Sequence, residues 1–139
     1  MHFIIRRSKD LHFAMKMHRM LIGTDPYKDL NIESNVWYVK RWIHSGVPVA
    51  YATSLDNEEG GWSYLNSCGV LAIARGHGLQ RRLIRARVQH ANRLGLTPIT
   101  YTLASNSYSV NNLVACGFRA YNPSYPWIGE DNVVYWIRK

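Results

Sequence analysis

A basic loop with two glycines constrains this chain more than any other stretch. It reads Arg75-Gly76-His77-Gly78-Leu79-Gln80-Arg81-Arg82. An apolar run at 69–74 precedes it, and apolar residues at helical spacing follow it to Leu94. Glycines let successive backbone N–H groups turn into one hollow, and a helix start adds the positive end of its dipole. The pattern therefore predicts a strand, a phosphate-binding loop and a helix.

Composition favours one folded domain with an anionic partner. The 139 residues are 47% hydrophobic and include five tryptophans and nine tyrosines, enough for an apolar core. We expect a single domain over residues 1–139. The formal net charge of +8 fits a polyanionic cofactor, an acidic partner or nucleic acid, and equally a solvated basic surface.

Signals for export, membranes and metals are weak. No apolar run approaches the roughly 20 residues of a membrane span, and the apolar start at 1–5 is too short for a signal peptide. Cys68 and Cys116 form no CxxC motif, and His12 and His18 do not share a helix face. We expect a cytoplasmic protein with buried thiols, no bound metal and no membrane contact.

The remaining pattern predicts a mixed α/β sheet that is antiparallel in its first half. Strands are expected at 2–6, 36–44, 47–54, 62–72, 98–103, 118–121 and 133–137. Helices are expected at 10–22, from the loop to about Leu94, and at 106–115. The segment 24–35 is either a wall of the substrate site, with a short helix, or a plain connector. The strand–helix–strand step from 62–72 to 98–103 predicts a parallel pair.

This element order and three motifs resemble the GNAT N-acetyltransferases. Their acetyl-CoA loop has the form Arg/Gln-x-x-Gly-x-Gly/Ala, which residues 75–80 match except for Gln80 in place of a small residue. Val70 stands at the apolar position five before the Arg, and the second signature runs from Asn106 to Gly117-Phe118. Other phosphate loops fail, because a dinucleotide fingerprint needs glycine at Arg81 and no Gly-Lys-Ser/Thr is present.

The resemblance implies transfer of an acetyl group from acetyl-CoA to an amine, in a mostly antiparallel sheet whose central parallel pair splays around the cofactor. Backbone groups of Cys68, Gly69 and Val70 would bind pantetheine, and the Val70 N–H would hold the oxyanion. The pyrophosphate would lie on the amides of Gly76, His77, Gly78, Leu79 and Gln80, near Arg75 and Arg81. Asn106 would steady the cofactor arm, together with three residues of the same helix: Ser109, Asn112 and Leu113. For the five arginines of this helix we expect one or two near phosphates and the rest on a solvated face: Arg81, Arg82, Arg85, Arg87 and Arg93.

The proton-transfer groups of the family are not evident. Members commonly have a Tyr seven residues after the Asn that protonates the leaving thiolate, and Leu113 stands there. Water could supply the proton, another group such as Tyr108, Tyr121 or Ser109 could replace the Tyr, or the protein only binds. Tyr64 and Asn66 could order a water that takes the proton of the amine. The other candidates for the base are Glu58, Glu59 and His44.

Two classes of function stay open. An N-acetyltransferase would act on a small molecule, a protein amine or an aminoacyl-tRNA. A non-catalytic module of the same fold would bind CoA, or a macromolecular partner such as nucleic acid or tRNA, through its basic surface. Both a monomer and a homodimer are compatible with the sequence.

Overall fold

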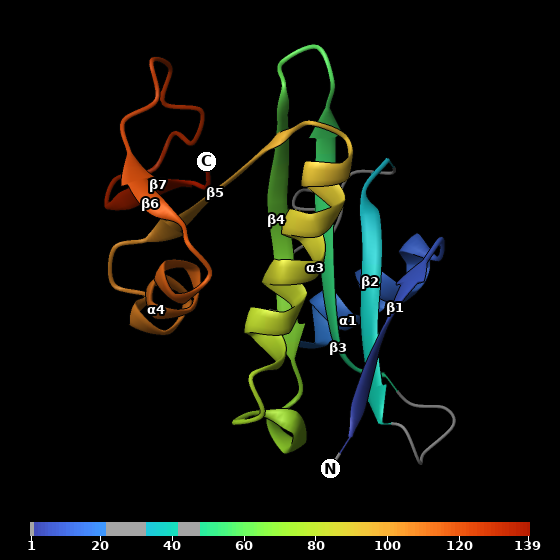
Figure 1. Cartoon of the computed structure of the whole chain (residues 1–139). Coiled ribbons are helices and arrows are strands. Elements are labelled where there is room, and N and C mark those ends of the chain that lie inside the picture. The colour runs from blue at the N-terminus through green and yellow to red at the C-terminus, as the bar shows by residue number, and fades with distance from the viewer. Residues whose placement is uncertain (1, 22–32, 42–47) are drawn as a thin grey trace.

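A seven-stranded sheet forms the centre of the protein, in a computed structural model that describes residues 2–21, 33–41 and 48–139 (Figure 1). The strand order is β1-β2-β3-β4-β5-β7-β6. The strands are β1 (Phe3–Ser8), β2 (Asn35–Arg41), β3 (Pro48–Asn57), β4 (Trp62–Val70), β5 (Thr97–Leu103), β6 (Arg119–Tyr121) and β7 (Val133–Ile137). The helices are α1 (Leu11–Leu21), the short 3-10 helix η1 (Ala72–Ala74), α3 (Leu79–Arg93) and α4 (Ser107–Ala115). Among the described strands only β4 and β5 pair in parallel, which confirms the predicted mixed α/β fold.

The predicted elements are present where they fall within the described residues, with shifted ends. The strand predicted at 62–72 ends at Val70, because Leu71 N donates to Val49 O and Ala74 N donates to Leu71 O to begin η1. The helix predicted from Asn106 begins one residue later, because the Asn106 side chain accepts from Ser109 N and caps it. Predictions for residues 22–32 and 42–47, including His44, lie outside the described residues.

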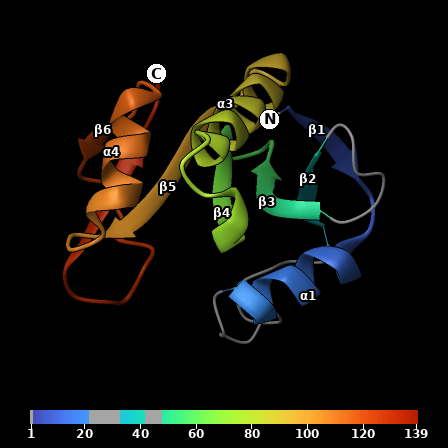
Figure 2. The same cartoon turned by 90° about the horizontal axis from the view of Figure 1, so that it is seen from below.

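The sheet is covered on both faces near its centre. Figure 2 shows α1 on one side of the strands and α3 on the other. On its side, α1 buries Ala14 and Met17 against Val36 and Tyr51. On the opposite side, α3 buries an apolar stripe that begins with Leu79 and Leu83 against β2 and β3. Within the described ranges, no helix has the length and apolar character that crossing a bilayer requires.

The ladder between β4 and β5 is short, and the two strands then separate (Figure 1). Only three pairs join them, from Trp62 with Thr97 to Tyr64 with Ile99. Thr100 Oγ1 donates to Leu65 O at 2.8 Å just beyond the last pair. On the other edge of β4, the register with β3 shifts. Residues 64–67 of β4 pair with the shorter stretch 53–55 of β3, so β4 contains one extra residue there, which is a β-bulge. The sheet is therefore open beyond Tyr64.

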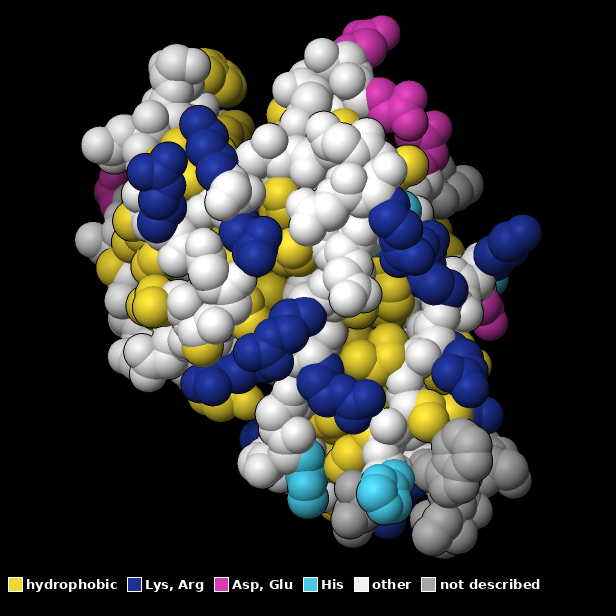
Figure 3. Space-filling view, viewed as in Figure 1, with side chains coloured by type: hydrophobic (Ala, Val, Ile, Leu, Met, Phe, Trp, Pro, Cys, Tyr) yellow, Lys and Arg dark blue, Asp and Glu magenta, His cyan; other side chains and the backbone are white. Residues whose placement is uncertain are grey.

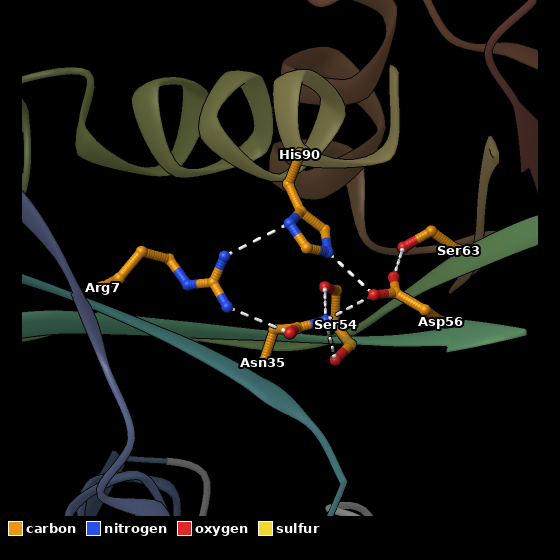
Figure 4. A network of polar contacts seen from close by, with 6 residues as sticks. All are labelled: Arg7, Asn35, Ser54, Asp56, Ser63 and His90. Atoms are coloured by element: carbon orange, nitrogen blue, oxygen red, sulfur yellow. Dashed lines mark hydrogen bonds and ion pairs between the residues drawn. The ribbon is translucent and has the colours of Figure 1, made fainter. Parts of the chain in front are cut away.

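A polar network fastens the first strands to α3 (Figure 4). Arg7 Nη1 donates to His90 Nδ1 at 3.2 Å, which leaves His90 Nε2–H to donate to Asp56 Oδ2 at 2.8 Å. Asn35 and Ser63 also donate to the Asp56 carboxylate, at 2.9 and 2.7 Å. Burial would raise the pKa of Asp56, but the hydrogen bonds from His90, Ser63 and Asn35 outweigh it and lower the pKa. The network thus holds Asp56 ionised between four elements.

Candidate functional site

The loop before α3 has the backbone geometry of an anion cradle. Gly76 and Gly78 have φ of 82° and 71°, a left-handed conformation that residues with a Cβ rarely adopt. No atom lies within 4 Å of a Cβ built at either position, so the space beside them is open. Gly78 is the N-cap of α3, and the first N–H groups of a helix have no acceptors within it. The loop and the first turn of α3 therefore offer backbone donors to an anion.

Two side chains in the first turn of α3 connect this helix to α4. Gln80 Oε1 accepts from Asn112 Nδ2 at 3.0 Å, and Gln80 Nε2 reaches Ser109 Oγ at 3.5 Å. Arg81 Nε donates to Asn112 Oδ1 at 2.8 Å. The place of the usual small residue is thus filled by an amide whose partners lie on α4.

The side chains of Arg75 and His77 contact different strands, β4 and β1. Arg75 Nε donates to Val70 O at 3.3 Å. The His77 ring packs against Phe3 with ring centroids 5.2 Å apart. Leu79 is buried in the core. The cradle is therefore defined chiefly by its backbone.

The free edge of β4 carries two N–H groups. Leu71 N–H bonds to Val49 O on β3, and neighbouring residues of a strand direct their backbone groups to opposite edges. The N–H groups of Cys68 and Val70 therefore face away from β3, toward the space that β5 has left. The contact from Arg75 to Val70 O lies on this same edge.

Two adjoining cavities lead from the cradle into the opening of the sheet. The outer one, about 450 Å³, is lined by residues that include Gly69, Val70, Arg75, Asn106 and Tyr108. The inner one, about 350 Å³, lies where β4 and β5 separate and is lined from both faces of the sheet. Cys68, Gln80 and Ser109 line both cavities. A long, thin ligand could thus extend from the cradle to the centre of the sheet.

Some of the predicted site residues line one or both of these cavities, and others line neither. Asn106 and Tyr108 line only the outer one; the Asn106 side chain already caps α4, and Tyr108 is 61% exposed. Leu113 is buried and lines the inner cavity. Tyr121 lies on β6 against Tyr135, and it lines neither of them.

The candidates for ordering a water lie on the wall of the inner cavity. Tyr64 packs with Tyr101 and Trp127, with ring centroids 5.1 to 6.4 Å apart. Asn66 Oδ1 accepts from Thr53 Oγ1 at 2.6 Å. Glu58 and Glu59 are exposed in the turn between β3 and β4 and do not line this cavity.

A buried histidine at the inner cavity was missed by the sequence prediction. His18 on α1 is 2% exposed, and its Nδ1 lies 2.8 Å from Tyr51 Oη and 3.0 Å from Ser67 Oγ. The two hydroxyl oxygens are 2.6 Å apart. His18 and Ser67 line the cavity. The sequence held one indication, because His18 is one turn beyond Ala14 on the buried stripe of α1.

A buried arginine was also missed, and its predicted exposure is wrong. Arg87 is only 3% exposed and lines the inner cavity. It donates to three carbonyls, from Nε to Leu83 O at 3.1 Å and from Nη1 to Thr53 O at 3.2 Å and Ser67 O at 3.3 Å. Burial lowers the pKa of Arg87. Its position four residues after Leu83 and four before Ala91 places it on the apolar stripe of α3.

No metal centre accompanies these groups in the part of the chain that the structure covers, since no three His, Cys, Asp or Glu side chains cluster there. Cys116 lies with Phe118 in the core beneath α4, and burial raises the pKa of its thiol.

Solved structures with the same fold are acetyltransferases. An IAA acetyltransferase from Bacillus cereus superposes with a TM-score of 0.78 at 14% identity, covering 99% of each chain. A Bacillus subtilis acetyltransferase in complex with CoA has a TM-score of 0.75 at 13% identity, covering 99% of this chain and 98% of its own. The ribosomal-protein-S18-alanine N-acetyltransferase of Escherichia coli has a TM-score of 0.74 at 13% identity, covering 99% of this chain and 93% of its own. At these identities the superpositions establish the fold alone.

Sequence comparison identifies the family. No curated protein matches the sequence. The model of the acetyltransferase (GNAT) family matches residues 8–118, from the end of β1 to the Gly117-Phe118 pair. The match includes the cradle, the free edge of β4 and α4. The chain belongs to the GNAT acetyltransferase family.

Proposed function

We propose that this protein transfers the acetyl group of acetyl-CoA to the amine of an acceptor. The observation that carries the proposal is a pair of adjoining cavities that begins at Arg75 and Gln80, the two ends of the glycine cradle, and follows the free edge of β4 to a point lined from both faces of the sheet. Two substrates can meet there from opposite sides. Related structures are described with CoA or acetyl-CoA bound, which supports the identity of the donor.

The cofactor residues follow from this path. The amides of 76–80 would hold the pyrophosphate at the start of α3, and the edge from Cys68 to Val70 would bind the pantetheine amides. Cys68 lines both cavities, whereas Val70 lines only the outer one. We therefore place the thioester carbonyl beside the Cys68 N–H, two residues deeper than the position favoured by sequence. A backbone N–H held at this point would stabilise the oxyanion as it forms.

His18 is our candidate for the group that takes the proton of the attacking amine. Its hydrogen-bonded partner Ser67 reaches the same cavity, so the proton can pass to the imidazole directly or through the Ser67 hydroxyl. The titratable groups that face this pair in the described structure are the Tyr51 phenol on β3 and, across β4, Cys68 and Arg87. No carboxylate among the described residues lines the inner cavity.

The aromatic wall indicates where the acceptor would lie. Tyr64, Tyr101 and Trp127 pack together on β4, on β5 and in the loop before β7. Aromatic faces attract cationic groups and bury apolar ones. An acceptor amine in its protonated, ammonium form could bind against these aromatic rings before it loses its proton.

Thiol release tests the proposed function. The protein is incubated with acetyl-CoA and, separately, with small amines, peptides with a free N-terminus and aminoacyl-tRNA, while CoA binding is measured by calorimetry. We expect CoA to bind and at least one class of amine to accelerate thiol release. Binding without release on any amine would refute the transferase proposal.

One observation favours a second candidate, a module that binds a polyanion. A groove of about 430 Å³ between β1 and α3 is lined by five arginines: Arg6, Arg7, Arg82, Arg85 and Arg93. Within the described residues, no Lys or Arg forms an ion pair with a carboxylate. Figure 3 shows Lys and Arg side chains spread over this face. RNA binding that weakens steeply with salt, and is lost in Arg85→Gln/Arg93→Gln, would support this candidate, and salt-independent absence of binding would remove it.

A further inference from the structure

We propose that Arg87 stabilises the leaving CoA thiolate, in place of the proton donor that the family pattern puts at Leu113. The proposal rests on the proposed function. The two residues line the same inner cavity, one from α3 and the other from α4. A fixed cation there would stabilise the sulfur as an anion, so no proton would be needed when the C–S bond breaks.

Arg87 carries a charge that folding alone does not require. An ionised side chain loses several kcal/mol of hydration on burial unless an opposite charge compensates it. Arg87 is 3% exposed, and no carboxylate among the described residues pairs with it. Its partners are carbonyl oxygens, which orient the guanidinium without neutralising it. A buried and uncompensated charge beside a cavity is typical of a functional group.

Two of the carbonyls that Arg87 contacts, those of Thr53 and Ser67, lie where the β3–β4 ladder supplies a donor. Leu71, the residue after β4, faces Val49 on β3, and Leu71 N donates to Val49 O, so these two residues form a hydrogen-bonded pair that continues the ladder. Hydrogen-bonded pairs recur at every second position of an antiparallel ladder. Thr53 and Ser67 face each other four residues along, so they also exchange ladder bonds. Arg87 Nη1 is therefore an additional donor, and its removal leaves neither carbonyl without a partner.

The guanidinium has donor capacity left for a ligand. Nε and Nη1 make the three bonds to carbonyls, and Nη2 forms no hydrogen bond within the described chain. The Cys68 thiol beside the same cavity shows how Arg87 acts on sulfur. Burial raises the pKa of that thiol, and the charge of Arg87 opposes the rise. A second sulfur, brought into the cavity by the cofactor, would be affected in the same way.

The step balances without a proton donor at position 113. The attacking amine is neutral, because its ammonium proton has already passed through His18 to solvent. Its nitrogen forms the new N–C bond and then loses one further proton, which passes to His18. The thioester C–S bond breaks, and its electron pair stays on the sulfur as a thiolate beside Arg87. The thiolate is released as such or takes a proton from water, and His18 returns its proton to solvent.

The experiment compares Arg87→Met with Arg119→Met, an exposed arginine on β6 that lines neither cavity of the site. The pH titration of the thiol of bound CoA is followed by the ultraviolet absorbance of the thiolate, which requires no acceptor. We expect the thiol of CoA bound to the wild type to titrate about one pH unit lower than that of CoA bound to Arg87→Met. The midpoint of urea unfolding should stay the same or rise, and kcat should fall about 100-fold. Arg119→Met should match the wild type in all three.

Arg87→Lys keeps the positive charge. The thiol of CoA bound to this variant should titrate at a pH between those of the wild type and Arg87→Met, which provides a test even if Arg87→Met does not fold. Identical titration in all CoA-bound variants would overturn the proposal. A lower unfolding midpoint in Arg87→Met with an unchanged thiol would assign Arg87 a structural role instead. No CoA binding by the wild type would refute the proposed function and this inference together, whereas bound CoA with an unchanged thiol refutes this inference alone.

Discussion

Replacing Gly78 by Glu should abolish CoA binding without unfolding the protein. The left-handed backbone at this position, with φ of 71°, costs a residue with a Cβ roughly 1–2 kcal/mol. The new Cβ meets no atom within 4 Å, so no clash adds to this cost. Strain of this kind affects the free and the bound protein equally and leaves affinity unchanged.

The loss of affinity comes from charge. A carboxylate about 6 Å from each of two pyrophosphate charges is repelled by about 3 kcal/mol per charge at an effective dielectric constant near 20. Even half of that total lowers affinity more than 100-fold, since each 1.4 kcal/mol is about tenfold.

The chain offers a matched control at the other end of the same helix. Gly95 also has φ of 71° and also has no atom within 4 Å of a built Cβ. Gly95→Glu therefore introduces the same strain and the same charge far from the cradle. Calorimetric titration with CoA should show weak or no binding to Gly78→Glu and normal binding to Gly95→Glu. Equal affinities in two folded variants would refute the cradle.

Three further changes test other parts of the structure. His18→Gln should lower kcat about 100-fold at pH 7 and restore activity at high pH, where the amine is already neutral; an unchanged pH–rate profile would leave His18 a core residue. Asp56→Asn should reduce the free energy of unfolding at pH 7, because the pKa of Asp56 is lowered in the folded state. That difference should shrink as the pH falls below the ordinary pKa of aspartate and vanish below the lowered one, as urea unfolding over a pH series would show; a constant difference would contradict it. Leu113→Tyr should recover part of the kcat lost in Arg87→Met, because a phenol in the inner cavity can protonate the thiolate, and a double variant no faster than Arg87→Met would contradict this.

Local patterns sufficed for the parts of the fold that depend on local geometry. The two glycines, the apolar run before them and the stripe after them predicted the cradle, because each is a property of neighbouring residues. The short β4–β5 ladder followed only from the family resemblance, since it depends on a bulge and on register. Arg87 was judged by its charge, although its spacing from Leu83 and Ala91 placed it on the buried stripe. The contact of His18 with Ser67 joins residues far apart in sequence and requires the packing of α1 on β4.

The short ladder at the centre of the sheet has a consequence for cooperativity. Seven pairs join β3 to β4 and five join β5 to β7, but only three join β4 to β5. The ladder between β6 and β7 also has three pairs, but β6 is the edge strand. The β4–β5 ladder is thus the weakest junction in the interior of the sheet, between one unit of β1 to β4 and another of β5 to β7. A ligand bound between the separated strands would contact both units and add to the few bonds that join them. In the free protein, amide hydrogens of the two units should exchange with solvent at different rates, because each unit can open separately. With the ligand bound, the rates in both units should fall toward one slow value, because the two units then open together.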